Sequence, residues 1–235
     1  MACAYGYELR QFIRRILKMN EINEKKITAE DFFICLINTA ENKDILDVCP
    51  HRDMYDMSIV YRLVLEKNDI LRATVLVTND MANSLGLTEA QLYAYGIAHT
   101  ANALQLQIVS LTDAIDDLMS QPEDEELKKA WEEESKHSEE HPMWVSSTPY
   151  NHFGASIFMC NSELSSLADH IGTNLYIIPS SIDECIILPA IDDLSAAELA
   201  EMLHTLNDTL DDGMLLSDNI YYYDNQKHEL SIVED

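Results

Sequence analysis

The chain has 235 residues and a formal net charge of −27 at neutral pH, and it is long enough for one large domain or two small ones. Its hydrophobic fraction of 47% and charged fraction of 24% are ordinary for a globular protein, which excludes global disorder. A pI near 4.4 opposes direct binding to nucleic acid or to an anionic membrane, and it favours a basic protein partner.

The first segment, residues 5–20, is predicted to be an amphipathic helix, because its apolar and basic residues recur on separate helical faces. The apolar stripe is Leu9, Phe12, Ile13, Ile16 and Leu17, and the basic residues are Arg10, Arg14, Arg15 and Lys18. The basic face could dock on an external acidic partner, on the acidic part of the same chain or on a second copy. A homodimer therefore stays open.

Strands and helices of a first lobe follow, and this lobe is placed at residues 1–119. Strands are predicted at residues 32–38, 57–65 and 73–78 from their apolar alternation and β-branched residues. Two helices are predicted next, one at 80–85 that ends at Gly86 and one that begins after Thr88 as its N-cap.

Residues 120–142 are predicted to form an acidic connector, since glutamates cluster around Pro122 with few apolar residues among them. A second lobe, residues 143–235, follows. Strands are predicted at 143–147, 154–159, 175–179 and 184–189, helices at 162–170 and from Ser195 to 210, and a hairpin at 220–224 with 229–233. Adjacent pairs of strands without βαβ alternation indicate an α+β fold of two lobes, with mainly antiparallel sheets and flanking helices.

Negative charge is concentrated in the later part of the chain. Up to Arg72 there are 11 basic and 12 acidic residues, whereas after it there are 4 and 30, and no lysine or arginine lies between Lys136 and Lys227. Such a surplus must face water and gives one surface a strongly negative potential. The candidate partner-binding residues are Asp192, Asp193, Glu198, Glu201, Asp208, Asp211 and Asp212. A solvated acidic face is the alternative. A calcium-binding loop is disfavoured, because the aspartates before Gly213 match the ligand spacing of such a loop only in part.

Ser180, Ser181 and Asp183 form a polar island between two apolar strands, which could line a pocket or simply close a turn. The run Cys49-Pro50-His51 places a thiol near an imidazole, although a nucleophile and its base usually meet through the fold rather than as near neighbours.

The pattern His137-Ser-Glu-Glu-His141 formally fits a zinc-protease motif. It lies in a polar run that ends at Pro142, so no metal site is expected. The chain has only 6 glycines and no phosphate-binding glycine loop, so no nucleotide or other cofactor is expected either.

Several short sequence segments together resemble an uncharacterised family from gut-dwelling anaerobic Gram-positive bacteria and their mobile elements. The segments are residues 42–46 (NKDIL), 50–52 (PHR), 56–60 (DMSIV), 78–80 (TND), 85–88 (LGLT), 154–156 (GAS), 175–184 (LYIIPSSIDE) and 216–224 (LSDNIYYYD). The resemblance implies an α+β bacterial protein and supplies no catalytic residues. The connector looks enlarged and more acidic than the family pattern.

We therefore expect a non-enzymatic interaction or regulatory protein, an inhibitor that imitates the charge of nucleic acid and binds a basic surface of a host or defence protein. The partner could itself be a nucleic-acid-binding protein. The alternative is a cytosolic hydrolase with a carboxylate or Cys/His site, which a cleft enclosing His51, His99 or His152 with carboxylates would favour. Five widely spaced cysteines and no visible signal peptide favour the cytoplasm.

Overall fold

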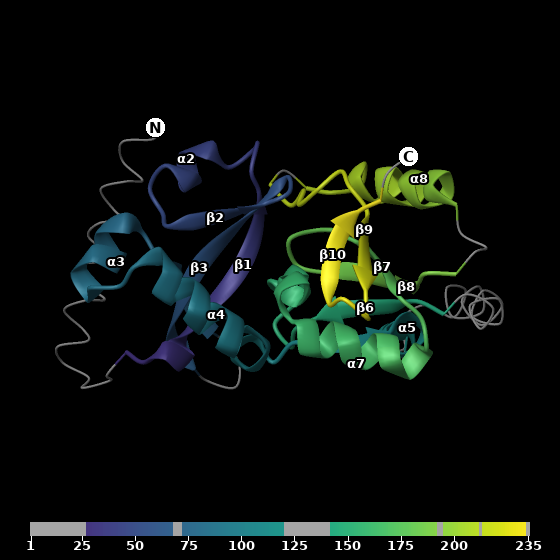
Figure 1. The fold of residues 1–235 in the computed structure, drawn as a ribbon, viewed down its shortest axis with the longest axis horizontal. Coiled ribbons are helices and arrows are strands. Elements are labelled where there is room, and N and C mark those ends of the chain that lie inside the picture. Colours follow the sequence, from purple (N-terminus) through teal and green to yellow (C-terminus); the bar gives the residue numbers. More distant parts are fainter. Residues whose placement is uncertain (1–26, 68–71, 120–141, 192–194, 212, 234–235) are drawn as a thin grey trace.

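Two antiparallel sheets lie side by side along the long axis of the molecule (Figure 1). The computed structural model describes residues 27–67, 72–119, 142–191, 195–211 and 213–233. The predicted helix of residues 5–20, residues 120–141 of the predicted connector and the pattern from His137 to His141 lie outside the described residues.

The long strand β3 organises the first sheet. β1 pairs along it over seven residues, and β2 and β4 pair with its successive halves, all antiparallel. The strands are β1 (Phe32–Asn38), β2 (His51–Met54), β3 (Met57–Lys67) and β4 (Arg72–Leu76), and the helices are η1 (Ala29–Asp31), α2 (Lys43–Leu46), α3 (Asn79–Leu85) and α4 (Glu89–Leu104). Helix α4 begins with a capping box between Thr88 and Gln91, and α3 ends at Gly86 in the left-handed conformation, as the sequence predicts.

Side chains rather than another strand close the outer edge of β1. The backbone N–H of Ile34 donates to the Thr100 hydroxyl of α4 at 2.9 Å, and the Ser156 hydroxyl donates to the Ile34 carbonyl at 2.8 Å. Helix α4 comes this close because residue 96 is glycine, where a Cβ would lie 2.4 Å from Ile34 Cγ1. The edge is thereby protected from pairing with a further strand.

The second sheet has the order β10-β9-β7-β8-β6-β5, and its neighbours are all antiparallel. Its strands are β5 (Gln107–Ser110), β6 (Trp144–Ser147), β7 (Leu175–Ile178), β8 (Cys185–Pro189), β9 (Tyr221–Asp224) and β10 (Glu229–Ile232). The helices beside it are α5 (Leu111–Met119), η2 (Gly154–Met159), α7 (Asn161–Ile171) and α8 (Ala196–Asn207).

Apolar residues cover both faces of this sheet. Leu175 and Ile177 of β7 belong to the main core, together with residues of the first sheet, and we call their side the inner face. Ile178 and Leu188 pack with α8 in a separate cluster, on what we call the outer face. Burial on both sides explains why β7 and β8 read as continuous apolar runs instead of alternating ones.

The two sheets share one core and are also joined by hydrogen bonds. Asp56, in the turn between β2 and β3, accepts from the Ser217 hydroxyl at 2.6 Å and from the Tyr221 hydroxyl. The neighbouring Tyr55 donates to the carbonyl of Leu230, on β10. Burial, and then the bond to Asp56, raise the pKa of Tyr221 above its ordinary value. This turn therefore fastens the first sheet to the edge of the second.

The α+β fold of two mainly antiparallel sheets is confirmed, although several elements differ from the sequence prediction. The predicted strand at 154–159 is wrong, because this segment is the 3₁₀ helix η2. Five consecutive residues of η2, from Gly154 to Phe158, are buried. The segment packs against β1, α4 and β6, so it lacks the buried and exposed faces of an edge strand. The short strands β2 and β5 were not predicted, and β5, inside residues 1–119, pairs with β6 of the second sheet.

An acidic groove beside helix α8 as the candidate functional site

Helix α8 lies on the outer face of the second sheet and carries part of the acidic surface. Ser195 caps it by accepting from the Glu198 N–H, while the Glu198 carboxylate accepts from the Ser195 N–H at 2.9 Å. Leu199 and Leu203 are buried against the sheet. The helix is thus fixed by its leucines and by the cap, in which Glu198 takes part, whereas Glu201 contributes to neither.

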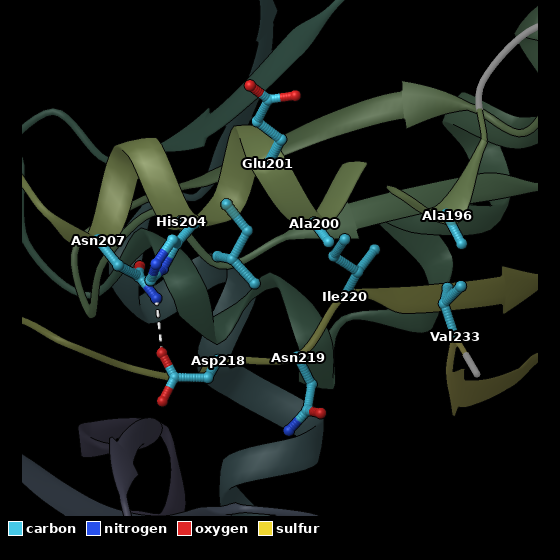
Figure 2. Close-up of a pocket in the computed structure, with 10 residues that line it drawn as sticks. Ala196, Ala200, Glu201, His204, Asn207, Asp218, Asn219, Ile220 and Val233 are labelled. Carbon is cyan, nitrogen blue, oxygen red and sulfur yellow. Dashed lines mark hydrogen bonds between the residues drawn. The ribbon is translucent and has the colours of Figure 1, made fainter. Parts of the chain in front are cut away.

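A groove of about 900 Å³ runs beside α8, between the helix and the segment around Ile220. Figure 2 shows Ala200 facing Ile220 and Ala196 near Val233, with Glu201 and Asp218 to either side. The groove is lined by Ala196, Ala200, Glu201, Leu203, His204, Asn207, Asp218, Asn219, Ile220 and Val233, and we call it the α8 groove. It has an apolar floor and a polar rim that holds two carboxylates and neither lysine nor arginine.

Asn207 organises the polar end of the α8 groove. Its Nδ2 donates to Asp218 Oδ1 at 2.9 Å (Figure 2) and to the Ser217 carbonyl at 3.3 Å. Its Oδ1 is buried and accepts no hydrogen bond from any described residue. The side-chain amide therefore fixes one carboxylate of the rim and leaves an acceptor unsatisfied beside it.

The described part of residues 142–233 contains 11 carboxylates and one lysine. The carboxylates are Glu163, Asp169, Asp183, Glu184, Glu198, Glu201, Asp208, Asp211, Asp218, Asp224 and Glu229. The single lysine, Lys227, is held by Asp224, with 2.8 Å between Nζ and Oδ2. The remaining negative charge is therefore not balanced by a lysine or arginine among these described residues.

The predicted partner-binding residues fall into three groups. Glu201 lines the α8 groove, while Glu198, Asp208 and Asp211 are exposed on α8 or just after it. Asp192, Asp193 and Asp212 lie outside the described residues.

The polar island of Ser180, Ser181 and Asp183 forms a turn between β7 and β8. The Ser181 hydroxyl accepts from the N–H of Asp183 at 3.0 Å and from that of Glu184 at 3.2 Å, and the Ser180 hydroxyl donates to the Glu184 carbonyl at 3.0 Å. Asp183 Oδ1 accepts from the Phe153 N–H at 2.9 Å, and its Oδ2 lies 3.4 Å from His152 Nδ1. These groups satisfy one another and do not line the α8 groove.

A second hollow, of about 590 Å³, holds the Cys49 and His51 candidates beside Asp47 and Glu89. Burial raises the pKa of the Cys49 thiol to about 11, so it stays protonated at neutral pH and is a poor nucleophile. His51 Nδ1 lies 3.1 Å from the Cys49 carbonyl oxygen rather than on its sulfur.

The Glu89 carboxylate in this hollow is occupied. Arg52 donates to both of its oxygens, at 3.1 and 3.0 Å, and the Tyr61 hydroxyl donates to Oε1. Burial raises the pKa of Glu89, but the bonds from Arg52 and Tyr61 outweigh it, and the net pKa lies below the ordinary value. An ionised and engaged carboxylate of this kind ties β2, β3 and α4 together.

Other chemistry finds little support in the described part of the chain. Burial raises the thiol pKa of Cys35, Cys160 and Cys185 as well. Within the same residues, His, Cys, Asp and Glu side chains do not gather in groups of three or more as metal ligands would. None of the helices there is both long enough and apolar enough to cross a membrane.

Comparison with known proteins identifies the family. Residues 5–225 match the model of a family of unknown function, DUF5688, and the chain therefore belongs to this family. Neither a curated protein nor a solved structure matches it.

Sequence reasoning identified Glu201 but missed the rest of the α8 groove. The available signal was the pair Ala196 and Ala200 at four-residue spacing, which leaves the first turns of one side of a leucine-bearing helix without bulky residues. The opposite wall comes from Asn219, Ile220 and Val233, whose position depends on the fold.

Proposed function

We propose that this protein is a non-enzymatic interaction protein whose acidic second sheet binds a basic surface of another protein. The observation that carries this proposal is the count of 11 carboxylates against one paired lysine in the described part of residues 142–233. Negative charge that holds no structural contact lowers the stability of a compact domain by self-repulsion. Attraction of a basic partner would explain why the chain carries it.

The partner we propose is a protein whose basic surface normally holds nucleic acid. Spaced carboxylates on a folded surface resemble a row of phosphates in charge, and attraction of this kind speeds association and weakens with salt. The resemblance to a family from mobile elements of gut bacteria suggests an inhibitor of a host or defence protein in the cytoplasm. The chain itself would repel DNA.

A cytosolic hydrolase is the second candidate, and one observation favours it. The hollow beside Cys49 brings His51 together with Asp47 and Glu89, which is the kind of cleft in which a hydrolase site is sought. The hydrolase is the less favoured candidate, because the Cys49 thiol is protonated and the Glu89 carboxylate is already bonded to Arg52 and Tyr61.

The test is capture of partners from a lysate of the source organism on the immobilised full chain, at about 50 mM and about 500 mM salt, because the Debye length falls from roughly 14 to 4 Å over this range. A basic partner should be held at low salt only, and excess duplex DNA should displace it. A variant with three charge reversals around α8, which leave the Ser195–Glu198 cap intact, should lose it: Glu201→Lys, Asp208→Lys and Asp211→Lys.

The matched control reverses three exposed carboxylates of the first sheet and its connections: Glu41→Lys, Asp44→Lys and Asp53→Lys. It changes the net charge equally and should retain the partner. Equal loss in both variants would reduce the proposal to a non-specific charge effect. Hydrolytic activity that disappears in His51→Ala and survives the reversals around α8 would favour the hydrolase.

A further inference from the structure

We propose that the α8 groove is the anchor point of this binding surface and accepts an aliphatic side chain from a basic peptide segment. This inference rests on the proposed function, because it names where a basic partner attaches and which chemistry it must present. The apolar floor of the groove and the two carboxylates of its rim point to the same ligand.

The floor of the groove selects an aliphatic group. Ala196 and Ala200 extend no further than Cβ, so they leave space between α8 and the side chains of Ile220 and Val233 (Figure 2). Larger residues occupy the adjacent face of the same helix, where Leu199 and Leu203 reach the sheet. An aliphatic side chain placed over Ile220 would remove apolar surface from water on both sides.

The rim of the groove selects cations next to that side chain. Glu201 and Asp218 both line the groove, and Asn207 Nδ2 donates to Asp218 Oδ1 (Figure 2). Asn207 Oδ1 itself is buried and out of reach of a ligand in the groove, so the carboxylates are the acceptors that the rim offers. Two carboxylates without a lysine or arginine among the lining residues match a ligand that carries donors and positive charge.

The same charges exclude two other occupants. A second copy bound face to face would bring Glu201 and Asp218 against a like surface, in a region whose single described lysine is bound to Asp224. An anionic membrane surface would be repelled in the same way. A basic peptide segment is the occupant that the charge favours.

The experiment measures binding of two fluorescein-labelled synthetic peptides to the full chain by fluorescence anisotropy. One peptide consists of repeating lysine and leucine residues, and the other has serine in place of every leucine, so that both carry the same charge. Ala200→Phe fills the groove, and Ala197→Phe adds the same ring at an exposed position of α8 that does not line it.

The leucine peptide should bind the unaltered chain about tenfold more tightly than the serine peptide, as burial of one aliphatic side chain implies. Ala200→Phe should remove this advantage and leave the serine peptide unaffected, which also shows that the variant is folded. Ala197→Phe should behave like the unaltered chain.

A second pair of variants tests the rim. Glu201→Gln with Asp218→Asn should weaken both peptides by about fivefold, whereas Asp80→Asn with Glu229→Gln, at exposed sites elsewhere, should have less effect. Leucine-peptide affinity that survives Ala200→Phe, or falls equally in Ala197→Phe, would overturn the groove proposal while salt-dependent binding of both peptides still upheld the proposed function. Failure of both peptides to bind at about 50 mM salt would reject the proposed function itself.

Discussion

The two faces of the second sheet are built in opposite ways. On the inner face, polar groups serve the fold: the Ser156 hydroxyl binds the Ile34 carbonyl, and Asp56 accepts from Ser217 and Tyr221. On the outer face, α8 is held by leucines and an N-terminal cap, and Glu201 and Asp208 point to solvent. The difference separates the charges that hold the protein together from those that are free to meet a partner.

The largest expected effect on the packed interior, in contrast to the outer face, comes from high pH. Burial raises the pKa of the Cys35, Cys160 and Cys185 thiols, whereas an unfolded chain releases these protons near pH 8.5. The folded state therefore binds more protons above this pH, and stability falls as pH rises towards the folded-state pKa values. Each thiol should cost about 1.4 kcal/mol per pH unit.

Urea unfolding at pH 7, 8, 9 and 10 measures this effect, under reducing conditions that prevent oxidation. The free energy of unfolding should change little up to pH 8 and fall steeply beyond pH 9. Replacing Cys185 with Ala should make the fall in the free energy of unfolding shallower by about 1.4 kcal/mol per pH unit. A constant stability up to pH 10 would contradict the burial of these thiols.

Gly154→Ala should be the most damaging single substitution among those considered. A Cβ at this position would lie 2.3 Å from the Asp183 carbonyl oxygen and 2.8 Å from that of Ser146. Both are backbone atoms and cannot rotate away, so we expect a loss of about 3 kcal/mol or more. Thermal unfolding measures it. The control is Gly86→Ala, where the left-handed backbone (φ 68°) has open space around it and the expected loss is about 1 kcal/mol.

Asp56→Ala should cost less, about 2 kcal/mol, because the carboxylate is partly accessible to water. It removes the acceptor that Ser217 and Tyr221 share. A double-mutant cycle with Tyr221→Phe measures the coupling between the two groups, and we expect about 1 kcal/mol or more. Additive effects would mean that the turn does not fasten the two sheets.

Local patterns explain which parts of the fold could be predicted from the sequence. β1 and β3 follow from apolar, β-branched runs, and α4 and α8 follow from Thr88 and Ser195 as caps. The error at Gly154 has a non-local cause, because the segment is buried from several sides and pairs with no strand. No local periodicity encodes such an environment.

The candidate site divides in the same way. Glu201 could be identified because a surplus of charge is visible in composition alone. The floor of the α8 groove could not, since Ala200 meets Ile220 and Ala196 meets Val233 only after α8 and the strand β10 are placed on the sheet. The role of Asn207 also depends on Asp218, eleven residues further along the chain.

The smallest expected effect on stability belongs to the outer face, and it is the one that most directly separates the two faces. Glu201→Gln with Asp208→Asn and Asp211→Asn removes three exposed charges from a surface that holds few cations. The free energy of unfolding should change by about 0.5 kcal/mol or less, in the stabilising direction, because like charges are removed. This gain should shrink as salt rises.

Asp183→Ala is the contrasting variant: it removes one carboxylate that binds the Phe153 N–H, and it should cost about 1 kcal/mol with little dependence on salt. If the triple variant were clearly destabilised, the carboxylates around α8 would have a structural role and would not be free for a partner.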